Sequence, residues 1–376
     1  MAAKPAILFI SEPNRESNIY KTAIKKNFQI FHHQFESKDP ESFLQYLHDT
    51  FDEDKAPLTA IYGGYPCFMP IGGLTREILE HEYFPANTLR CITVCSRGIN
   101  GIDLEALSEF DIKLFNYNDD SKNCSSNPEL VMKQDLVGND VADCALWHVM
   151  EGFRKFSYQQ QSLREHPNTL TSRFLLTGKD PQVPQFAFGH ELSKCMVKSP
   201  RGQKVLILGL GAIGKQIGHK LHHGLGMEVH YTKRAPDTTV TWRFHDFNDS
   251  LFDELKQFST IIVALPGTSE TRHLVDDKFL SHCSEELILV NIGRGFILDQ
   301  VAVDKALREN RLRHLGIDVF YNEPDVSRTL VEAEASVTIT PHIASSTEDV
   351  FNQSCDVALN NIIKTVLGPQ MKQDCN

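Results

Sequence analysis

Short runs of apolar residues alternate with amphipathic stretches through the first third of the chain. The amphipathic stretches, such as Ser42–Thr50 and Leu74–His81, repeat their apolar residues at the spacing of a helix. The apolar runs between them have the length and composition of strands. Such alternation is typical of βαβ units and predicts a parallel sheet. The strands predicted here are Ala6–Ile10, Phe28–His33, Leu58–Tyr62, Leu89–Cys95 and Ile112–Tyr117.

A second series of the same kind begins at Lys204. It again places helix-like stretches between short apolar runs, so it predicts a second parallel sheet. We therefore expect an α/β protein with two Rossmann-like domains. The strands predicted for the second sheet are Lys204–Leu208, Met227–Tyr231, Thr260–Leu265, Leu287–Ile292, Leu315–Val319 and Val337–Thr340.

Two longer helical patterns flank the second series. The first extends to about residue 156, and either Asn139 or Asp140 can cap it. The second runs from Ser346 to Leu367, with Ser345 or Ser346 as the candidate cap. A helix of this length can carry the chain from one domain to the other.

These helices divide the chain into two predicted domains. The first is discontinuous and combines residues 1–137 with residues 346–376, whereas the second comprises residues 138–345. Residues 159–202 contain several prolines and few periodic apolar positions. We interpret them as an excursion on the surface or at a subunit interface.

Composition and charge narrow the class of protein. The 376 residues are 41% hydrophobic and 23% charged, which is typical of a soluble globular protein with room for two domains. A net charge of −11 argues against a nucleic-acid partner, which requires a basic face. The apolar run Ala6–Ile10 is too short for a signal sequence or a membrane span. Nine cysteines without a CxxC pair indicate reduced thiols. We expect a cytoplasmic protein.

Metal binding is not expected. The doublets His32-His33 and His222-His223 have no further ligand at the spacing of a metal site. We interpret them as residues of a strand edge and of a helix.

A glycine-rich turn follows the strand Lys204–Leu208 and precedes an amphipathic helix. Unpaired amides and the helix dipole at such a helix start attract a pyrophosphate. Gly209 permits the tight turn, Gly211 lets the phosphates approach the backbone, and Gly214 lets the helix pack closely on the strand. A bare glycine turn can have the same letters, but the strand and helix around it favour dinucleotide binding. The predicted contacts are Gly209, Gly211, Ala212, Ile213 and Gly214.

Three polar residues follow other strands of the second series. Arg294, Glu323 and His342 come after the third-last, second-last and last predicted strands. Because ligands of open parallel sheets bind at the carboxyl ends of the strands, the three are expected beside the nucleotide. Singly, each has an ordinary interpretation: a surface charge, a loop carboxylate and a turn residue.

Together the three residues suit the reduction of a carbonyl that lies next to a carboxylate. An arginine can grip the carboxylate with its planar fork. A histidine can give or take the proton at the carbonyl oxygen, and a carboxylate on its far ring nitrogen favours the protonated ring. A nicotinamide would supply the hydride.

These segments resemble the D-isomer-specific 2-hydroxyacid dehydrogenases. The resemblance spans nearly the whole chain, and the fungal branch that includes yeast D-mandelate dehydrogenase is similar through the segment Phe188–Glu191 and the closing helix. Glyoxylate/hydroxypyruvate reductases belong to the same family. The matching signatures are Asn291-Ile292-Gly293-Arg294-Gly295 with Leu298-Asp299, Gly316-Ile317-Asp318-Val319-Phe320 through Glu323-Pro324, and Thr340-Pro341-His342-Ile343.

The resemblance implies roles for these residues. Arg294 would bind the substrate carboxylate and carbonyl, Glu323 would orient His342, and His342 would act as the acid and base. Asp318 would contact the nicotinamide carboxamide. The implied architecture is a flavodoxin-like substrate domain and an NAD(P)-binding Rossmann domain, with the active site in the cleft between them. Further cofactor contacts are expected at Leu265, Pro266, Thr271, Ile292 and Gly293.

The resemblance also implies a substrate loop, Ser96-Arg97-Gly98-Ile99-Asn100, whose backbone amides would hold the carboxylate. The substrate-binding residues expected there are Arg97, Gly98 and Ile99. Arg97 departs from the family, which usually has a small apolar residue at this position, so the loop carries an additional positive charge.

The end of the second strand of this series favours NADP(H) over NAD(H). NAD-preferring members keep an acidic residue there to bind the ribose 2′-hydroxyl, but this chain has Thr232-Lys233-Arg234. A charge-assisted hydrogen bond is worth about 1.5–3 kcal/mol, so two of them favour a 2′-phosphate by roughly 10²–10⁴-fold. The alternative is a solvated basic turn with NAD(H) as the cofactor.

The sequence therefore predicts NADPH-dependent reduction of a 2-oxo acid to the D-2-hydroxy acid, or its reverse, by a homodimer without a membrane partner. One alternative is glyoxylate or hydroxypyruvate as the specific substrate. Another is a nucleotide-sensing binding protein, similar to the transcriptional corepressors of the family. The side chain of the substrate and the physiological direction stay open.

Overall fold

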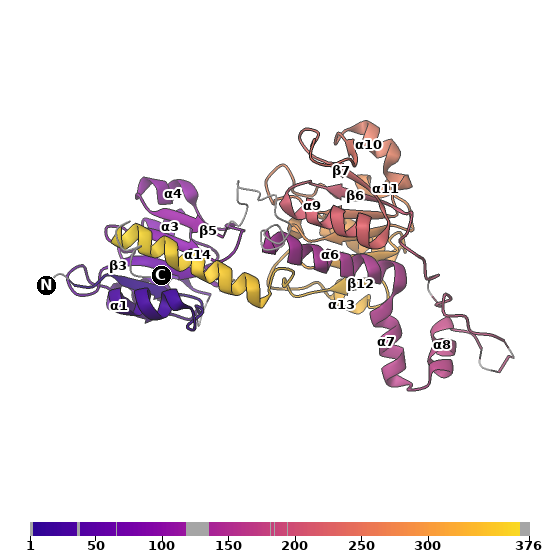
Figure 1. Cartoon of the computed structure of the whole chain (residues 1–376), viewed down its shortest axis with the longest axis horizontal. Coiled ribbons are helices and arrows are strands. Elements are labelled where there is room, and N and C mark those ends of the chain that lie inside the picture. The colour runs from indigo at the N-terminus through magenta and orange to yellow at the C-terminus, as the bar shows by residue number, and fades with distance from the viewer. Residues whose placement is uncertain are drawn as a thin grey trace. The chain divides into compact units, whose positions relative to one another are not determined.

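The computed structural model describes residues 3–35, 38–64, 66–117, 135–180, 182–183, 185–193 and 195–368. The chain divides into two compact units (Figure 1). The first combines Met1–Asn123 with Thr347–Asn376, and the second is Cys124–Ser346. Each unit contains one sheet whose paired strands are all parallel, which confirms the α/β class with two Rossmann-like folds.

The sheet of the first unit has the strand order β2-β1-β3-β4-β5, which is the flavodoxin-like arrangement. The central strands β1, β3 and β4 are buried along their whole length, as expected for a parallel sheet covered on both faces. All five predicted strands are confirmed, with ends that differ by one or two residues. The strands are β1 (Ala6–Phe9), β2 (Gln29–His32), β3 (Leu58–Gly63), β4 (Cys91–Val94) and β5 (Lys113–Asn116).

The closing helix α14 (Glu348–Leu367) returns the chain to the first unit, where it packs on β3, β4 and β5. Figure 1 shows this helix in yellow across the sheet. Its cap is Thr347, whose side chain accepts a hydrogen bond from the Val350 N–H, so the prediction of Ser345 or Ser346 was wrong. The other helices of this unit are α1 (Lys25–Asn27), α2 (Pro40–Thr50), α3 (Arg76–Leu79) and α4 (Leu104–Glu109), with short turns of helix at Tyr20–Ile24 and Met69–Ile71.

The sheet of the second unit has seven strands in the order β12-β11-β10-β9-β6-β7-β8. The strand order reverses between β6 and β9, and ligands of such sheets bind at this point. The predicted strands are confirmed, but the edge strand β8 was missed because it has three residues and shows no alternation. The strands are β6 (Lys204–Leu208), β7 (Glu228–Thr232), β8 (Arg243–His245), β9 (Thr260–Val263), β10 (Ile288–Asn291), β11 (His314–Ile317) and β12 (Val337–Ile339).

Helix α6 (Leu136–Arg154) packs on β10, β11 and the glycine-turn helix α9 (Ala212–His219). It begins one turn earlier than expected, because Asp135 caps it by accepting a hydrogen bond from the Gly138 N–H; the prediction of Asn139 or Asp140 as the cap was wrong. The remaining elements are α10 (Asp249–Glu254), α11 (Asp277–Ser281), α12 (Gln300–Arg308), α13 (Arg328–Glu332) and helical turns at Lys220–Gly224, Leu255–Gln257 and Gly295–Ile297.

Residues 159–202 contain helical structure that the sequence pattern did not reveal. Helices α7 (Phe156–Glu165) and α8 (Thr169–Thr177) pack against each other, and Asn168 caps the second by accepting from two backbone amides. Apolar side chains of this segment face solvent, including Leu170 at 74% and Phe186 at 82% exposure. A helix without a buried apolar stripe lacks the periodicity from which helices are predicted.

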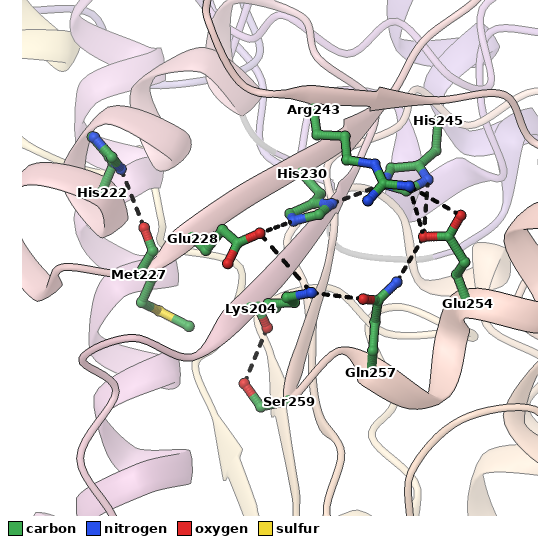
Figure 2. A network of polar contacts seen from close by, with 10 residues as sticks. All are labelled: Lys204, His222, Met227, Glu228, His230, Arg243, His245, Glu254, Gln257 and Ser259. Atoms are coloured by element: carbon green, nitrogen blue, oxygen red, sulfur yellow. Dashed lines mark hydrogen bonds and ion pairs between the residues drawn. The ribbon is translucent and has the colours of Figure 1, made fainter.

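A polar network joins β7 to the edge strand β8 (Figure 2). The wholly buried His230 lies 2.8 Å from His245 and 2.8 Å from Glu228. Arg243 pairs with Glu254 at 3.2 Å. These side chains attach the short strand β8 to the sheet.

Two further features of the described residues concern membrane helices and cysteines. Among the described residues, no helix combines the length and the apolar character that crossing a bilayer requires. The cysteines in the described ranges are free thiols, most of them at least partly buried.

Candidate active site

The glycine turn has the geometry that a dinucleotide requires. Gly209 has φ +98°, a conformation that side chains rarely adopt, and an added Cβ at Gly214 would lie 2.2 Å from the Gly209 carbonyl oxygen. An added Cβ at Gly211 would meet nothing within 4 Å. Gly211 also caps α9, whose first amides, those of Ala212, Ile213 and Gly214, have no partner within the helix. The turn is therefore tight on the protein side and open toward a ligand, which fits a pyrophosphate.

The loops after β9 and β10 lie beside this turn. An added Cβ at Gly209 would lie 2.9 Å from the Leu265 side chain, and one at Gly293 would lie 2.7 Å from the Leu265 carbonyl oxygen. Ile292 is buried, and the Thr271 hydroxyl donates to the Pro266 carbonyl at 2.8 Å. The structure thus brings the predicted cofactor residues of three strands to one edge of the sheet.

The basic turn after β7 also contains a carboxylate, that of Asp237. Lys233 Nζ lies 2.6 Å from Asp237 Oδ2, and Lys215 Nζ lies 3.0 Å from the same oxygen. Hydrogen bonds from Lys233, Thr239 and Lys215 hold the pKa of Asp237 far below its usual range. Thr232 is buried at the strand end and Arg234 is exposed. Lys233 and Asp237 are four residues apart, but they lie in a loop and not in a helix, so their spacing alone does not predict the pair.

Glu323 and His342 form a hydrogen-bonded pair. His342 Nδ1 lies 2.9 Å from Glu323 Oε2, and the other carboxylate oxygen accepts from the Phe320 N–H at 3.0 Å. Burial by itself would raise the pKa of Glu323, but the bond from His342, the Phe320 amide and the nearby charges outweigh it and leave this pKa lowered. The carboxylate is 15% exposed and the imidazole 30%, so the ring can reach a ligand.

Arg294 belongs to the same neighbourhood. It lies in the loop after β10, and an added Cβ at Gly295 would overlap the Phe320 carbonyl, so this loop lies directly on the loop that carries Glu323. Burial lowers the pKa of Arg294, and the negative charge of Glu323 opposes this shift. The guanidinium donates to the Gly293 carbonyl at 2.7 Å. Arginine, glutamate and histidine are therefore brought together, as the sequence predicted.

Asp318 connects the end of β11 to the loop that carries His342. Its carboxylate accepts from the Thr340 hydroxyl at 2.6 Å and from the amides of Ile343 and Ala344 at 2.9 and 3.1 Å. Burial raises the pKa of Asp318, and these hydrogen bonds oppose the shift. His342 lies within this loop at φ +53°.

The expected substrate loop follows β4 in the first unit. The Arg97 carbonyl accepts from the Asn116 side chain at 2.8 Å, and the Gly98 carbonyl accepts from the Ser96 hydroxyl at 2.8 Å. Ile99 ends the turn by accepting from the Ile102 N–H at 3.3 Å. These bonds hold the loop in a defined conformation within its own unit, whereas the Arg294, Glu323 and His342 cluster belongs to the second unit.

Comparisons with known proteins agree with this fold. The family profile described as "D-isomer specific 2-hydroxyacid dehydrogenase, NAD binding domain" matches residues 151–344. A candidate 2-hydroxyacid dehydrogenase of Saccharomyces cerevisiae is 49% identical over 97% of this chain and 94% of its own length. The glyoxylate/hydroxypyruvate reductase B of Yersinia pestis is 31% identical over 45% of this chain and 52% of its own length.

Two solved structures have the same fold. D-mandelate dehydrogenase of Rhodotorula graminis, in its holo form, aligns with a TM-score of 0.76 and 24% identity over 97% of this chain and 95% of that chain. The NADPH-dependent glyoxylate/hydroxypyruvate reductase of Sinorhizobium meliloti, in complex with NADP and malonate, aligns with a TM-score of 0.69 and 23% identity over 96% and 93%.

The fold and the family profile define an oxidoreductase with a domain that binds a pyridine nucleotide. The family profile covers more than half of the chain, and the Saccharomyces relative matches nearly all of it. The chain belongs to the D-isomer specific 2-hydroxyacid dehydrogenase family.

Proposed function

We propose that the protein reduces a 2-oxo acid to the D-2-hydroxy acid with NADPH, and that it catalyses the reverse reaction as well. The observation that carries this proposal is the hydrogen bond between His342 Nδ1 and Glu323, with Arg294 beside it, at the sheet edge that holds the glycine turn. A bound nicotinamide supplies the hydride in reduction and accepts it in oxidation.

His342 acts as the general acid in reduction. Because Nδ1 is engaged by Glu323, we assign the exchanged proton to Nε2, which gives it to the oxygen of the substrate carbonyl. Glu323 holds Nδ1 and thereby fixes the orientation of the ring. Arg294 binds the carboxylate of the substrate, and Arg97, Gly98 and Ile99 supply further contacts to it.

The preference for NADPH rests on Lys233 and Arg234 after β7. Lys233 is already paired with Asp237, so a 2′-phosphate competes with that carboxylate for the ammonium. Arg234 is exposed. The hydrogen bond from Thr268 is the main cause of the lowered pKa of the Glu270 carboxyl, and the positive charge of the nearby Arg234 lowers this pKa further. The charge-assisted hydrogen bond from Arg234 by itself favours NADPH by roughly 10–10²-fold.

Glyoxylate and hydroxypyruvate are the second candidate substrates. The Yersinia relative is named for them, as is the Sinorhizobium structure. Arg97 adds a positive charge to the proposed substrate loop, which suits a small anionic substrate whose carboxylate is its main handle.

The experiment is a spectrophotometric assay of NADPH and NADH oxidation against glyoxylate, hydroxypyruvate, pyruvate and phenylglyoxylate. We expect turnover on at least one acid and a preference for NADPH that the double change Lys233→Ala with Arg234→Ala removes. The control is His342→Ala, which should lower kcat by about 10²–10⁴-fold and leave nucleotide affinity intact. Nucleotide binding without turnover on any acid would instead favour a nucleotide-sensing protein.

We also propose a homodimer in the cytoplasm. The proposed interface is the segment of α7, α8 and the residues that follow, because its large apolar side chains are exposed. A two-fold axis pairs such a surface with its own copy. Free thiols suit a reducing compartment.

A further inference from the structure

A row of polar side chains crosses the second unit from the end of α6 to the end of β11. We call it the Lys155–Asp318 chain. Its successive contacts are Lys155 Nζ to His314 Nδ1 at 2.7 Å, His314 Nε2 to Thr338 Oγ1 at 2.9 Å, Thr338 Oγ1 to His148 Nδ1 at 2.7 Å, His148 Nε2 to Thr340 Oγ1 at 3.4 Å, and Thr340 Oγ1 to Asp318 Oδ1 at 2.6 Å.

The two ends of the chain determine the direction of every hydrogen bond in it. A lysine ammonium can only donate, and an ionised carboxylate can only accept. His314 therefore accepts at Nδ1 and donates from Nε2, and Thr338 donates in turn to His148 Nδ1. His148 then donates from Nε2 to Thr340, which donates to Asp318. Both imidazoles are thus neutral with the proton on Nε2.

The surroundings of the two histidines agree with this direction. His148 is 0% and His314 is 1% exposed. Burial lowers the pKa of His148 to about 3 and that of His314 well below its usual value. Burial also lowers the pKa of Lys155, to about 8, so that its ammonium form predominates at pH 7. The charges are confined to the two ends.

The backbone is arranged to accommodate these side chains. Lys155 ends α6 at φ +53°, a conformation that favours glycine, yet its side chain is only 3% exposed and points inward to His314 and the Arg313 carbonyl. At Gly316 an added Cβ would lie 2.5 Å from His148 Cβ, so this glycine makes the room for His148 against β11. The atom nearest to that added Cβ is the Cβ of His148, so the glycine also lets α6 pack closely on β11.

The far end of the chain lies in the candidate active site. Asp318 also accepts from the amides of Ile343 and Ala344, which directly follow His342. The orientation of this carboxylate therefore determines where the His342 loop lies, and the Thr340 bond restricts that orientation.

We propose that the Lys155–Asp318 chain holds the Asp318 carboxylate, and with it the His342 loop, in the position that nucleotide binding and proton transfer require. Lys155, His314, Thr338, His148 and Thr340 are then positioning residues. The link to proton transfer rests on the proposed function, whereas the link to nucleotide binding rests on the family's cofactor alone. The chain extends the site to α6, about which the family signatures say nothing.

The first test uses the protein without nucleotide or substrate. Imidazole ¹⁵N spectra at pH 7 should give the neutral Nε2–H tautomer for both His148 and His314. Thr338→Val removes the central hydroxyl at nearly constant shape and should shift both imidazole signals, whereas Thr338→Ser keeps the hydroxyl and should not. A protonated ring or an Nδ1–H tautomer at either histidine in the parent protein would overturn the proposal, even if Thr338→Val failed to fold.

The second test measures nucleotide affinity by fluorescence titration, and kcat on the best substrate, for the same two variants. We expect Thr338→Val to weaken nucleotide binding by about 10-fold and to lower kcat by about 10-fold, because one positioning hydrogen bond is lost. For Thr338→Ser, we expect both quantities to stay within about twofold of the parent. A lower Tm with unchanged affinity and kcat would show a merely structural role and overturn the proposal.

The two tests separate this inference from the proposed function. If no 2-oxo acid is turned over but Thr338→Val still weakens nucleotide binding, the proposed reaction fails and the positioning role stands. If turnover is found and Thr338→Val changes neither affinity nor kcat, the reaction stands and the positioning role fails.

Discussion

At the scale of single residues, the chemistry depends on how Glu323 holds His342. The carboxylate lies 2.9 Å from Nδ1 and is itself held by the Phe320 amide. The orientation of the ring is therefore fixed, and its Nδ1 side faces a negative charge. A carboxylate that is hydrogen-bonded to one ring nitrogen fixes the tautomer and the orientation of a catalytic histidine.

Glu323→Gln keeps the shape of this contact and removes its charge. We expect kcat for reduction to fall by about 10–100-fold, because a neutral amide holds the ring less firmly than the carboxylate does, while nucleotide affinity stays unchanged. Steady-state rates and a nucleotide titration measure the two quantities. A kcat equal to that of the parent would contradict the role of Glu323.

Arg294→Lys tests the grip on the substrate carboxylate. An ammonium cannot reproduce the planar fork, so we expect KM for the 2-oxo acid to rise by about 10-fold or more while nucleotide affinity stays unchanged. Steady-state kinetics and a nucleotide titration distinguish the two. An unchanged KM would exclude Arg294 as the carboxylate ligand.

At the scale of elements, two glycines of the same turn have different roles: Gly214 permits close packing, and Gly211 leaves room for a ligand. An added Cβ at Gly214 would lie 2.2 Å from a backbone oxygen, whereas one at Gly211 would meet nothing within 4 Å. Two alanine substitutions in one turn are therefore expected to act differently.

Gly214→Ala should lower the free energy of unfolding by about 2 kcal/mol or more, because α9 must move away from β6. Gly211→Ala should leave the free energy of unfolding within about 1 kcal/mol of the parent and should still weaken nucleotide binding, because the methyl group occupies the place proposed for the pyrophosphate. Urea unfolding and a nucleotide titration measure these effects. Equal stability of the two variants would refute this view of the turn.

The packing of α6 on β11 makes stability depend on pH. The pKa of His148 is lowered from 6.5 to about 3, so between these values the unfolded chain binds a proton that the folded protein does not. Stability should therefore fall as pH is lowered from 6.5 towards 3, by up to about 1.4 kcal/mol per pH unit from this group.

His148→Phe should flatten this pH dependence by close to one proton, whatever its effect on stability at pH 7. Urea unfolding at pH 7, 6 and 5 measures the slope, and His282→Gln at an exposed position serves as the control. The same slope in His148→Phe as in the parent would show that His148 is not the source.

At the scale of the whole molecule, the exposed apolar segment around α8 predicts the oligomeric state. Leu170 is 74% exposed, and Val301, which belongs to α12 and not to this segment, is exposed to a similar extent, 75%. We expect the parent protein to be a dimer in sedimentation equilibrium, Leu170→Asp to be a monomer, and Val301→Asp to stay a dimer. A monomeric parent would contradict the proposed interface.

Much of this molecule follows from the sequence alone. The strands of both sheets except β8, the glycine turn and the convergence of Arg294, Glu323 and His342 were predictable, because buried parallel strands are continuous apolar runs and all of them end at one edge. These signals lie within a few consecutive residues, so they can be identified without knowing which strands are neighbours.

Other features were decided only by the tertiary structure. The pairing of Lys233 with Asp237, the helices α7 and α8, and the Lys155–Asp318 chain have no periodic or motif signal. His148 and His314 are separated by a long stretch of chain, and they share Thr338 only because α6 packs on β11 and β11 pairs with β12. Local patterns determine which segments become strands and helices, but contacts between distant side chains depend on how those elements pack.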